Sequence, residues 1–568
     1  MTRRLTEILL TLLFPCLLNA TPLRQVEKLD RGLVVLKTGE GEAILSWRLL
    51  GYDPENTAFH LDRRSSGDDD WTRLTGEPLR SSFFIDRDFD PARAHAWSVI
   101  PLSGEHEGPR SRPVTLPAQA AIQPFLEIPI EKPPGGTSPD GKEFTYRAND
   151  LSVGDLDGDG DLEYLLRWEP TNSWGGGHGA HTGPVIIDAY DREKGRLWRI
   201  NLGPNINASA HITQMAAYDF DGDGRCELFL MTADGTIDGT GQPLGEARAD
   251  FRDKNGLVYQ GVEYLTVFEG ATGRALASVP FTPQRHPETA TPTREQTADI
   301  WGDDYGNRMN RFALTPAYLD GSRPSLVTAR GYYGGRAGKP GRTCLSAWNW
   351  RDGKLTPLWT FDTLGHPENQ GYIGQGNHQV SVADVDGDGR DEIIYGACAI
   401  DDNGRGLYTT GLGHGDSLHV GDLDPARPGL ETMSIHEGRG HDAGTELRAP
   451  DGSAIWKKHP GRDVGRGVAF DIDPRHPGAE VWSSGEKGIF NIRGEKISDR
   501  SPRWCNMAIW WDGDLLRELL DGSIIDKWDW ENERERRLVT GYRPPYNGGK
   551  INGSKSNPCL VADILGDW

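Results

Sequence analysis

The chain has 568 residues and a formal net charge of −22, with 72 glycines and 37 prolines. This length exceeds what one small core needs and predicts several domains or a large repeat architecture, while abundant turn residues without a long helical period favour short strands. The negative charge disfavours nucleic acids and anionic membranes as partners, because both repel an acidic surface.

Residues 1–20 predict a signal peptide. MTRRLTEILLTLLFPCLLNA carries two early arginines, an apolar run from Ile8 to Leu18 and a small residue at Ala20, which is the layout of a secretory signal. The run is too short to span a bilayer, and a lipid anchor on Cys16 is the less favoured alternative. We therefore expect a secreted or periplasmic protein. Separately, we expect a monomer. The remaining cysteines form an odd, scattered set that is not a disulfide framework: Cys226, Cys344, Cys398, Cys505 and Cys559.

Residues 21–122 predict a small β-sandwich similar to a fibronectin type III module. Short alternating runs such as GLVVLKT, EAILSWRLL and AHAWSVIPL are separated by turn residues, as in sandwich strands. Trp47 and Trp97 are then expected in the core rather than as platforms for sugars. The Pro- and Gly-rich stretch from Pro129 marks the passage into a second domain, residues 123–568.

The second domain is organised around an acidic repeat. VGDLDGDGDLEYLLRW begins at Val153, and near copies begin at Tyr218 and Val382. Calcium takes about six to eight oxygen ligands, and acids at alternate positions of a glycine-containing loop can turn toward one point. An EF-hand would need its glutamate at position 12 between helices, whereas here strand-like apolar runs follow. We predict calcium-binding loops within a β-protein; acidic turns without an ion are the alternative.

The predicted ligands occupy positions 1, 3, 5 and 9 of each copy, with one further acid in the first: Asp155, Asp157, Asp159, Asp161, Glu163; Asp219, Asp221, Asp223, Glu227; Asp384, Asp386, Asp388 and Glu392. Degenerate copies add Asp422, Asp424, Glu431, Asp471, Asp473 and Glu480, and a last partial copy has Asp563 and Asp567.

Hairpin-forming segments separate these loops, for example LTVFEGATGRALASV and AIWWDGDLLRELLDGSIIDKW. In the second, LLRELL fits a helix by pattern alone, but flanking Asp-Gly turns favour a hairpin. Sets of strands repeated along the chain predict a β-propeller. Six or seven units are visible and a ring of about eight is expected. Because little sequence follows the last loop, we expect the final blade to be truncated or completed by strands from the other end.

A second register accompanies the loops. The strand leading into each loop is preceded by a polar group: Asn149, His211, His378, His414, Arg466 and Lys555. The innermost strand of each propeller blade lines the axis, so these groups are predicted to converge in one cleft. For a single histidine the simpler explanation is a hydrogen bond between strands; the register shared by all six favours a site.

Imidazoles beside a guanidinium and an ammonium suit one chemistry. Arginine and lysine bind a carboxylate, and a neutral histidine can remove a proton. This combination fits β-elimination at a uronate. Paired acids for glycoside hydrolysis stay open because the chain is rich in acids, although most of the visible ones are explained by calcium.

The motifs ANDLSVGDLDGDGDLEYLLRWEPTNS, AHITQMAAYDFDGDGRCELFLMTADGTIDGTG and GRDVGRGVAFDIDPRHPGAEVW resemble polysaccharide lyase family 11, the rhamnogalacturonan lyases. The resemblance implies an eight-bladed propeller with several Ca²⁺ ions that cleaves rhamnogalacturonan I, a pectic polysaccharide, by elimination. It implies that His378 and His414 are catalytic and that Arg466 and Lys555 contact a disaccharide. It also implies rhamnose contacts at Asn149, Glu169, Asn552, Gly553 and Ser554, although the family usually has aspartate where this chain has Glu169.

Two rival functions stay open from the residues alone. One is a non-catalytic, calcium-stabilised propeller that binds pectin or a protein; the other is a glycoside hydrolase of the same fold. A basic, imidazole-bearing axis favours the lyase over an adhesion propeller. The segment HEGRGHDAGTEL has no long insertion, which favours endo over exo action.

Overall fold

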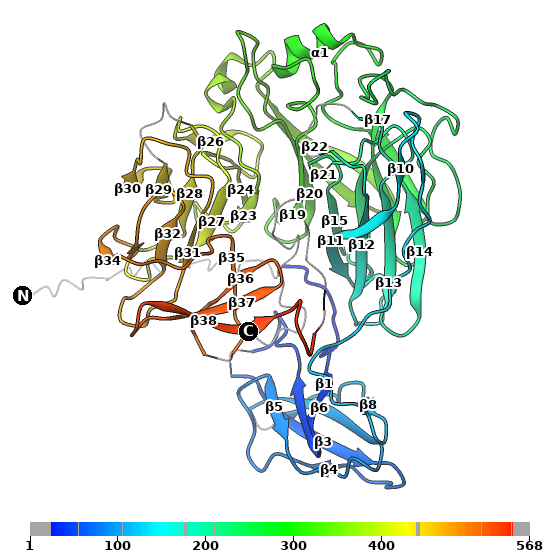
Figure 1. The fold of residues 1–568 in the computed structure, drawn as a ribbon, viewed down its shortest axis with the longest axis vertical. Helices are drawn as coiled ribbons and strands as arrows, with labels where there is room; N and C mark the ends of the chain where they lie inside the picture. Colours follow the sequence, from blue (N-terminus) through cyan, green and yellow to red (C-terminus); the bar gives the residue numbers. More distant parts are fainter. Residues whose placement is uncertain are drawn as a thin grey trace, which may run out of the picture.

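The computed structural model describes residues 24–546 and 548, except residues 55, 105, 175–179, 210, 439–443 and 513. Two β-domains follow one another along the chain: an N-terminal sandwich, blue in Figure 1, and a larger ring of sheets. The predicted signal peptide, Cys559, Asp563 and Asp567 lie outside the described residues.

The N-terminal domain packs two antiparallel sheets face to face. One has the order β1-β2-β5 and the other β4-β3-β6-β7, with β8 also pairing with β6. Trp47 and Trp97 are both fully buried between the sheets, which confirms their predicted place in the core. The strands are β1 (Val34–Gly39), β2 (Glu42–Ser46), β3 (Ala58–Ser65), β4 (Thr72–Arg73), β5 (Phe83–Asp86), β6 (His95–Ser103), β7 (His106–Glu107) and β8 (Val114–Leu116).

The described part of the second domain contains seven four-stranded antiparallel sheets, each built from consecutive strands. The first three are β11 (Tyr146–Gly154), β12 (Glu163–Pro170), β13 (Ile186–Asp191), β14 (Gly195–Asn201); β15 (Met215–Tyr218), β16 (Glu227–Ala233), β17 (Glu263–Glu269), β18 (Ala275–Pro280); and β19 (Phe312–Ala317), β20 (Ser325–Arg330), β21 (Cys344–Arg351), β22 (Lys354–Asp362). The fourth and fifth are β23 (Ser381–Ala383), β24 (Glu392–Ile394), β25 (Cys398–Ile400), β26 (Gly406–Thr409); and β27 (Ser417–Gly421), β28 (Glu431–Ile435), β29 (Thr445–Arg448), β30 (Ala454–Lys458). The last two are β31 (Gly467–Phe470), β32 (Glu480–Ser483), β33 (Ile489–Phe490), β34 (Lys496–Ser498); and β35 (Met507–Ile509), β36 (Glu518–Asp521), β37 (Ile524–Asp529), β38 (Arg534–Thr540).

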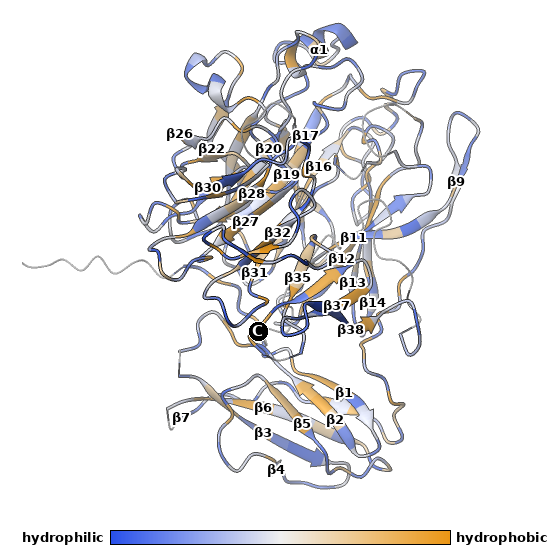
Figure 2. Cartoon of the chain, turned by 60° about the vertical axis from the view of Figure 1, so that its left-hand side comes forward, coloured by the Kyte–Doolittle hydropathy of each residue, from blue (hydrophilic) through white to orange (hydrophobic). Residues whose placement is uncertain are grey.

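The first strand of each sheet lies on the inner side of the ring. β11 contacts β15, β15 contacts β19, β23 contacts β27, and β27 contacts β31. The second and third strands are nearly continuous buried runs, such as EYLLRWEP in β12 and ELFLMTA in β16, because each sheet is covered on both faces by its neighbours. Hydrophobic segments accordingly lie on strands such as β32 and β35 in Figure 2. The repeating sheets agree with the predicted propeller, whereas its eighth blade stays a prediction.

Three local features depart from the expected plain repeat of strands. Helix α1 (Arg294–Trp301) was not predicted; Thr293 caps it in a capping box with Gln296, and Gly302 ends it at φ 91°. A short 3₁₀ helix spans Pro367–Tyr372, and β9 (Gly136–Thr137) pairs with β10 (Glu143–Phe144). The LLRELL segment forms a hairpin of β36 and β37 as predicted. No described helix has the length and apolar character needed to cross a membrane.

Residues 24–30, here called the N-terminal strap, connect the two domains. The Arg24 guanidinium lies 2.9 Å from Asp391. The Gln25 amide donates to the Ser322 carbonyl at 2.7 Å, and the Asp30 amide donates to the Gly160 carbonyl at 2.8 Å. These acceptors lie in turns of the fourth, third and first sheets, so the strap runs across one end of the ring.

Candidate functional site

Four of the predicted polar groups converge where the inner strands begin. His211, His378, His414 and Arg466 precede β15, β23, β27 and β31 by a few residues. The ring centroids of His211 and His378 are 5.3 Å apart, and those of His378 and His414 are 4.8 Å apart. The shared sequence register therefore corresponds to a shared place in the fold.

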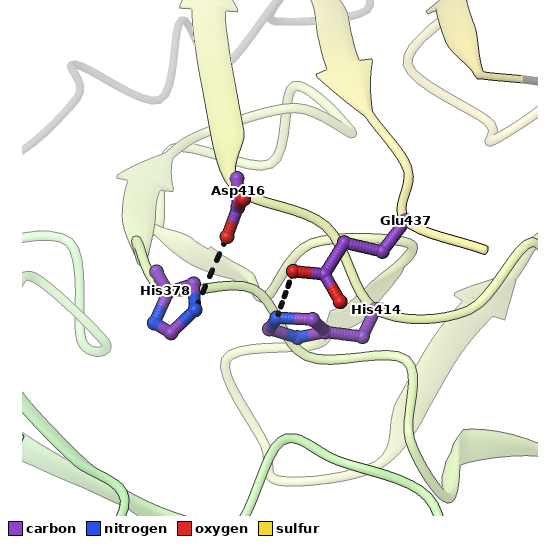
Figure 3. Close-up of side chains that lie close together, drawn as sticks. All are labelled: His378, His414, Asp416 and Glu437. Carbon is purple, nitrogen blue, oxygen red and sulfur yellow. Dashed lines mark ion pairs between the residues drawn. The ribbon is translucent and has the colours of Figure 1, made fainter. Parts of the chain in front are cut away.

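His378 and Asp416 form an ion pair at the centre of this group (Figure 3). The Nε2 atom of His378 is 3.1 Å from Oδ1 of Asp416, and Arg466 approaches the other oxygen of Asp416 at 3.3 Å. Burial opposes ionisation of Asp416, but the hydrogen bond from His378 and the nearby charges bring the pKa of Asp416 below its ordinary value. Asp416 therefore stays a carboxylate.

One nitrogen of the His414 ring is fixed by a hydrogen bond, and the other faces the neighbouring polar groups. Nδ1 donates to the Gly376 carbonyl at 2.6 Å, so Nε2 carries the lone pair. Nε2 is buried without a hydrogen-bond partner among the described residues, and the nearest carboxylate oxygen, of Glu437, is 3.9 Å away. Burial, followed by the charge of His378, lowers the pKa of His414 to about 3. The imidazole is therefore neutral at physiological pH.

Glu437 completes the group from the end of the fifth sheet, just after β28. Burial, together with the carboxylates of Asp416 and Asp463, raises the pKa of Glu437 to about 7. His414, Glu437 and Asp463 line a cavity of about 490 Å³ with the glycine-rich turns around Gly374 and Gly413. The site is thus an acidic, imidazole-bearing hollow with room for a ligand.

The residues His378, His414, Asp416 and Glu437 are called the central cluster below. One ligand atom from each of the four lies within 4.8 Å of the others, a spacing that can hold a metal ion. The buried, unpartnered Nε2 of His414 and the repulsion between carboxylates both fit a cation between these groups. Imidazole with carboxylate is a common ligand set for divalent metals.

Two tyrosines form one wall of the central cluster. The Tyr332 hydroxyl is 2.8 Å from Nδ1 of His378, and its ring stacks on His414 with centroids 5.1 Å apart. The Tyr333 ring lies 4.2 Å from the His414 ring, and its hydroxyl is 3.3 Å from Nε2 of His378. Arg311 covers both tyrosine rings at 5.7 and 5.2 Å. This wall fixes the orientation of both imidazoles.

Asn149 and Glu169 lie together in the first sheet. The Asn149 amide donates to Glu169 at 2.8 Å, and Glu169 is buried beside Arg147 and Arg167 at 3.6 and 3.7 Å. Arg167 also donates to the Ser209 carbonyl at 2.9 Å, close to His211 in sequence. The other predicted contacts, Asn552, Gly553, Ser554 and Lys555, lie outside the described residues.

The three strict repeats, residues 155–163, 219–227 and 384–392, are called the cation loops below. Each brings the acids of positions 1, 3 and 9 together: Asp155, Asp157, Glu163; Asp219, Asp221, Glu227; Asp384, Asp386 and Glu392. The position-1 aspartate also accepts backbone N–H bonds from the loop glycines, which shapes the turn.

The glutamate of position 9 is buried in each of the three loops. Its Oε2 accepts the backbone N–H that follows the first aspartate, as Glu163 does with Leu156 at 2.7 Å. Burial, reinforced by the neighbouring aspartates, raises the pKa of Glu163, Glu227 and Glu392 to about 8. Oδ1 of Asp157 and Oε1 of Glu392 are buried without a partner among the described residues. These oxygens are placed to bind a cation.

The position-5 acids differ from the prediction of four converging carboxylates. Asp159, Asp223 and Asp388 accept backbone N–H bonds within their own loops, and none of them belongs to the three acid groups above. Asp161, the further acid that the first loop carries at position 7, lies 3.7 Å from Arg112 of the sandwich. A short turn needs its own hydrogen bonds, and position 5 supplies one of them.

The two degenerate loops keep only part of this arrangement. Glu431 and Glu480 accept backbone N–H bonds through Oε2, and their Oε1 atoms are buried without a partner among the described residues. Asp424 accepts the Ala426 amide, and Asp473 pairs with Arg475 at 2.6 Å. Asp422 and Asp471 precede them, and burial raises the pKa of Asp471.

Sequence reasoning missed Asp416 and Glu437. It took one polar group per repeat at the start of the inner strand, whereas Asp416 follows His414 by two residues and Glu437 lies just after the second strand of the same sheet. A search for a second acid near each histidine would have found Asp416. Glu437 belongs to a different strand, so only the pairing of β27 with β28 brings it to the site.

Comparisons with known proteins match most of the chain. The family model "Rhamnogalacturonan lyase family 11, C-terminal domain" matches residues 125–568, and "Rhamnogalacturonan I lyases beta-sheet domain" matches residues 24–116. The chain is 46% identical to rhamnogalacturonan endolyase YesW of Bacillus subtilis over 546 residues, covering 96% of this chain and 82% of YesW. It is 48% identical to rhamnogalacturonan exolyase YesX of the same organism over 564 residues, covering 96% of this chain and 86% of YesX.

Solved structures agree with these matches. The crystal structure of YesW superposes with a TM-score of 0.86, covering 96% of this chain and 88% of that one. The rhamnogalacturonan lyase PL11 of Bacillus licheniformis is 48% identical and superposes with a TM-score of 0.87 over the same shares.

Proposed function

The chain belongs to family 11 of the rhamnogalacturonan lyases, and we propose that it cleaves rhamnogalacturonan I by β-elimination at galacturonate, with the central cluster as its catalytic centre. In this reaction the C5 proton leaves to a base, the C4–O4 bond breaks and a C4–C5 double bond forms. A lyase is favoured over a binding-only propeller because the buried imidazoles and carboxylates face a cavity.

The observation that carries this proposal is the unpartnered Nε2 of His414. With Nδ1 fixed on Gly376, the lone pair of Nε2 is directed to the same space as the oxygens of Asp416 and Glu437. A neutral imidazole and two carboxylates suit a divalent cation. When bound, the cation supplies positive charge near the uronate carboxylate, which makes the neighbouring C5–H more acidic.

The other residues of the site bind and orient. Arg466, held against Asp416, offers its remaining N–H groups to the substrate carboxylate. Tyr332 and the Gly376 carbonyl fix the two imidazole rings. Asn149 and Glu169 offer an amide and a carboxylate to sugar hydroxyls, with Arg147 and Arg167 offsetting the charge of Glu169.

The base needs a group that can accept a proton near neutral pH. A histidine whose pKa is about 3 is a weak base, and Nε2 of His378 is engaged with Asp416. Both histidines therefore serve better as ligands than as the predicted base. Among the predicted groups this leaves Lys555, which the resemblance makes a disaccharide contact. We assign proton removal to it, which requires a lowered lysine pKa such as burial or a nearby positive charge produces.

The test measures both activity and bound metal. In His378→Gln and His414→Gln, the rise in ultraviolet absorbance from the new double bond and the metal content are compared with wild type; His106→Gln, an exposed histidine of the sandwich, is the control. We expect loss of one bound ion and at least a 100-fold loss of activity, the lower end of the ~10²–10⁴ range that groups acting in proton transfer contribute. Lost activity with unchanged metal content would instead make a histidine the base.

Calcium is the ion we propose for the cation loops. Their ligands are carboxylate oxygens, which calcium prefers, and no described histidine belongs to these three acid groups. Calcium also suits an exported protein, since low-affinity loops are filled at extracellular concentrations. We therefore propose a secreted or periplasmic location, which N-terminal sequencing of the exported protein would check by cleavage near Ala20.

We further propose endo action. The support is the short connection between β28 and β29. It contains no long insertion that could close the cleft to an internal segment of the polymer. The named relatives include both an endolyase and an exolyase. A fall in polymer viscosity at few double bonds would support endo action, and release of disaccharide alone would refute it.

A further inference from the structure

The seventh sheet has a loop with the spacing of the cation loops. Following β35, Trp510 occupies position 1, and Asp512, Asp514 and Glu518 occupy positions 3, 5 and 9. Oε2 of Glu518 accepts the backbone N–H groups of Trp511 and Asp512 at 2.7 and 3.3 Å. Glu392 makes the same pair of contacts in the third cation loop, at 2.8 and 3.3 Å. The two turns therefore hold their glutamates in the same way.

The space between these acids is filled from the neighbouring strand. Nζ of Lys527 lies 2.6 and 2.7 Å from the oxygens of Asp512, 2.5 Å from Asp514 and 2.9 Å from Glu518. The Lys527 side chain is 10% exposed and that of Glu518 is fully buried. An ammonium thus touches all three carboxylates of the loop.

The strand register shows that this lysine replaces an acid. Lys527 in β37 lies opposite Glu518 in β36. In the second sheet the residue opposite Glu227 is Glu269, and in the fourth sheet Asp401 groups with Glu392. The side chain that faces the loop glutamate is therefore acidic in the second and fourth sheets and basic in the seventh. In the first sheet the half-exposed Lys194 reaches Asp157 at 2.7 Å.

We propose that Lys527 is the cation of the seventh loop, so that this loop is a cation site occupied by a tethered ammonium and binds no calcium. The inference rests on the proposal that the cation loops bind calcium. It distinguishes the three sheets whose loops bind a soluble ion from the seventh sheet, whose loop is neutralised by its own side chain.

Electrostatics explains why the two cations exclude each other. Three carboxylates within hydrogen-bond distance of Lys527 favour its charged form, despite burial. A calcium ion at the same oxygens would lie within a few ångströms of the ammonium and be repelled. The ammonium is held by its chain, so its occupancy does not depend on the free ion concentration, whereas that of calcium does.

The experiment counts bound calcium in purified variants at a fixed millimolar free calcium level, because the cation loops are proposed to be low-affinity sites. Asp512→Ala is expected to leave the wild-type count unchanged, whereas Asp386→Ala in the third cation loop, which removes the ligand oxygens, is expected to lower it by one. Lys527→Asp, which places an acid opposite Glu518, is expected to raise the count by one. Lys496→Asp, an equivalent charge change on an exposed lysine of the sixth sheet, is expected to leave it unchanged.

The outcomes separate this inference from the calcium proposal. An unchanged count in Asp386→Ala would refute calcium at that loop alone. Loss of one ion in Asp512→Ala would overturn the inference, as would a Lys527→Asp protein that gains none. Hydrogen exchange of the wild type gives a check that needs no variant: chelator should raise exchange in residues 384–392 and leave residues 516–521 protected, and equal loss of protection in both would contradict the proposal.

Discussion

At the scale of single residues, the site depends on how each imidazole is oriented. His378 has Tyr332 at Nδ1 and Asp416 at Nε2, while His414 is fixed through Gly376. Hydrogen bonds to the far nitrogen of a ligating histidine set which nitrogen faces the metal. The aromatic wall therefore matters for chemistry although it does not contribute a ligand.

Tyr332→Phe tests this role of the hydroxyl. It removes the 2.8 Å contact to His378 and keeps the ring that stacks on His414, so we expect about a 10- to 100-fold loss in kcat/KM or in metal affinity at the site. The matched control is Tyr218→Phe, which removes a tyrosine hydroxyl contact of 2.7 Å to Tyr318, away from the cluster. Equal activity of both variants would show that the hydroxyl does not position His378.

At the scale of elements, each cation loop joins the first and second strands of a sheet. Its turn is formed by backbone N–H bonds to the first aspartate and to the glutamate, so these hydrogen bonds give the turn its shape without an ion. What remains uncompensated is the charge of acids held close together. The ion therefore acts on stability more than on the shape of the turn.

Asp386→Ala removes the central ligand of the third cation loop. Because neighbouring sheets brace the fourth sheet, we expect a folded protein with one fewer bound ion and a loss of about 1–3 kcal/mol in the free energy of unfolding. Calorimetry with metal analysis measures both. A variant with wild-type stability and ion content would show that the spacing argument is wrong.

The buried glutamates predict how the metal-free protein responds to pH. The pKa values of Glu163, Glu227, Glu392 and Glu480 are raised to about 8, above the 4.5 of a free glutamate. A raised carboxyl pKa means that the folded state favours the protonated form, so this contribution is present below pH 4.5 and is lost as the pH rises through about 8. In chelator the melting temperature should fall across this window.

Calcium should remove most of that pH dependence, because a bound cation stabilises the ionised glutamates. Melting temperatures measured from pH 5 to 8, with calcium and with chelator, provide the comparison. Parallel curves in the two conditions would contradict cation binding at these loops.

At the scale of the whole molecule, the N-terminal strap couples the sandwich to the ring. Its residues contact turns of four consecutive sheets, including a 3.0 Å bond from the Gln25 side chain to the Asp219 carbonyl. Arg48 of the sandwich adds a 3.0 Å bond to the Gly160 carbonyl in the first cation loop. The N-terminal domain thus secures the loop end of the ring, opposite to the end where the inner strands begin.

A chain that starts at residue 125 would lack these contacts. Three backbone-directed bonds of the strap, at about 1 kcal/mol each, predict a loss of roughly 3 kcal/mol in stability, with the central cluster unchanged. Thermal melting of this fragment beside the full chain measures the effect. An identical melting temperature would show that the strap does not stabilise the ring.

The sequence by itself determined the local features of this protein. Acid spacing located the cation loops, turn residues separated the strands, and a common register of polar groups placed His211, His378, His414 and Arg466 at one end of the inner strands. These features are readable because each depends on neighbouring residues in the chain: a tight turn, an alternating strand or a fixed offset from a loop.

Only the tertiary structure decided which distant groups meet. Glu437 joins the central cluster through strand pairing, Lys527 enters the seventh loop from the opposite strand, and the N-terminal strap crosses turns up to 367 residues away. Position 5 of the loops had the expected acids, but they satisfy backbone N–H groups instead of joining the acid groups. Such outcomes depend on competition between hydrogen bonds, charge and burial in three dimensions, which spacing along the chain does not encode.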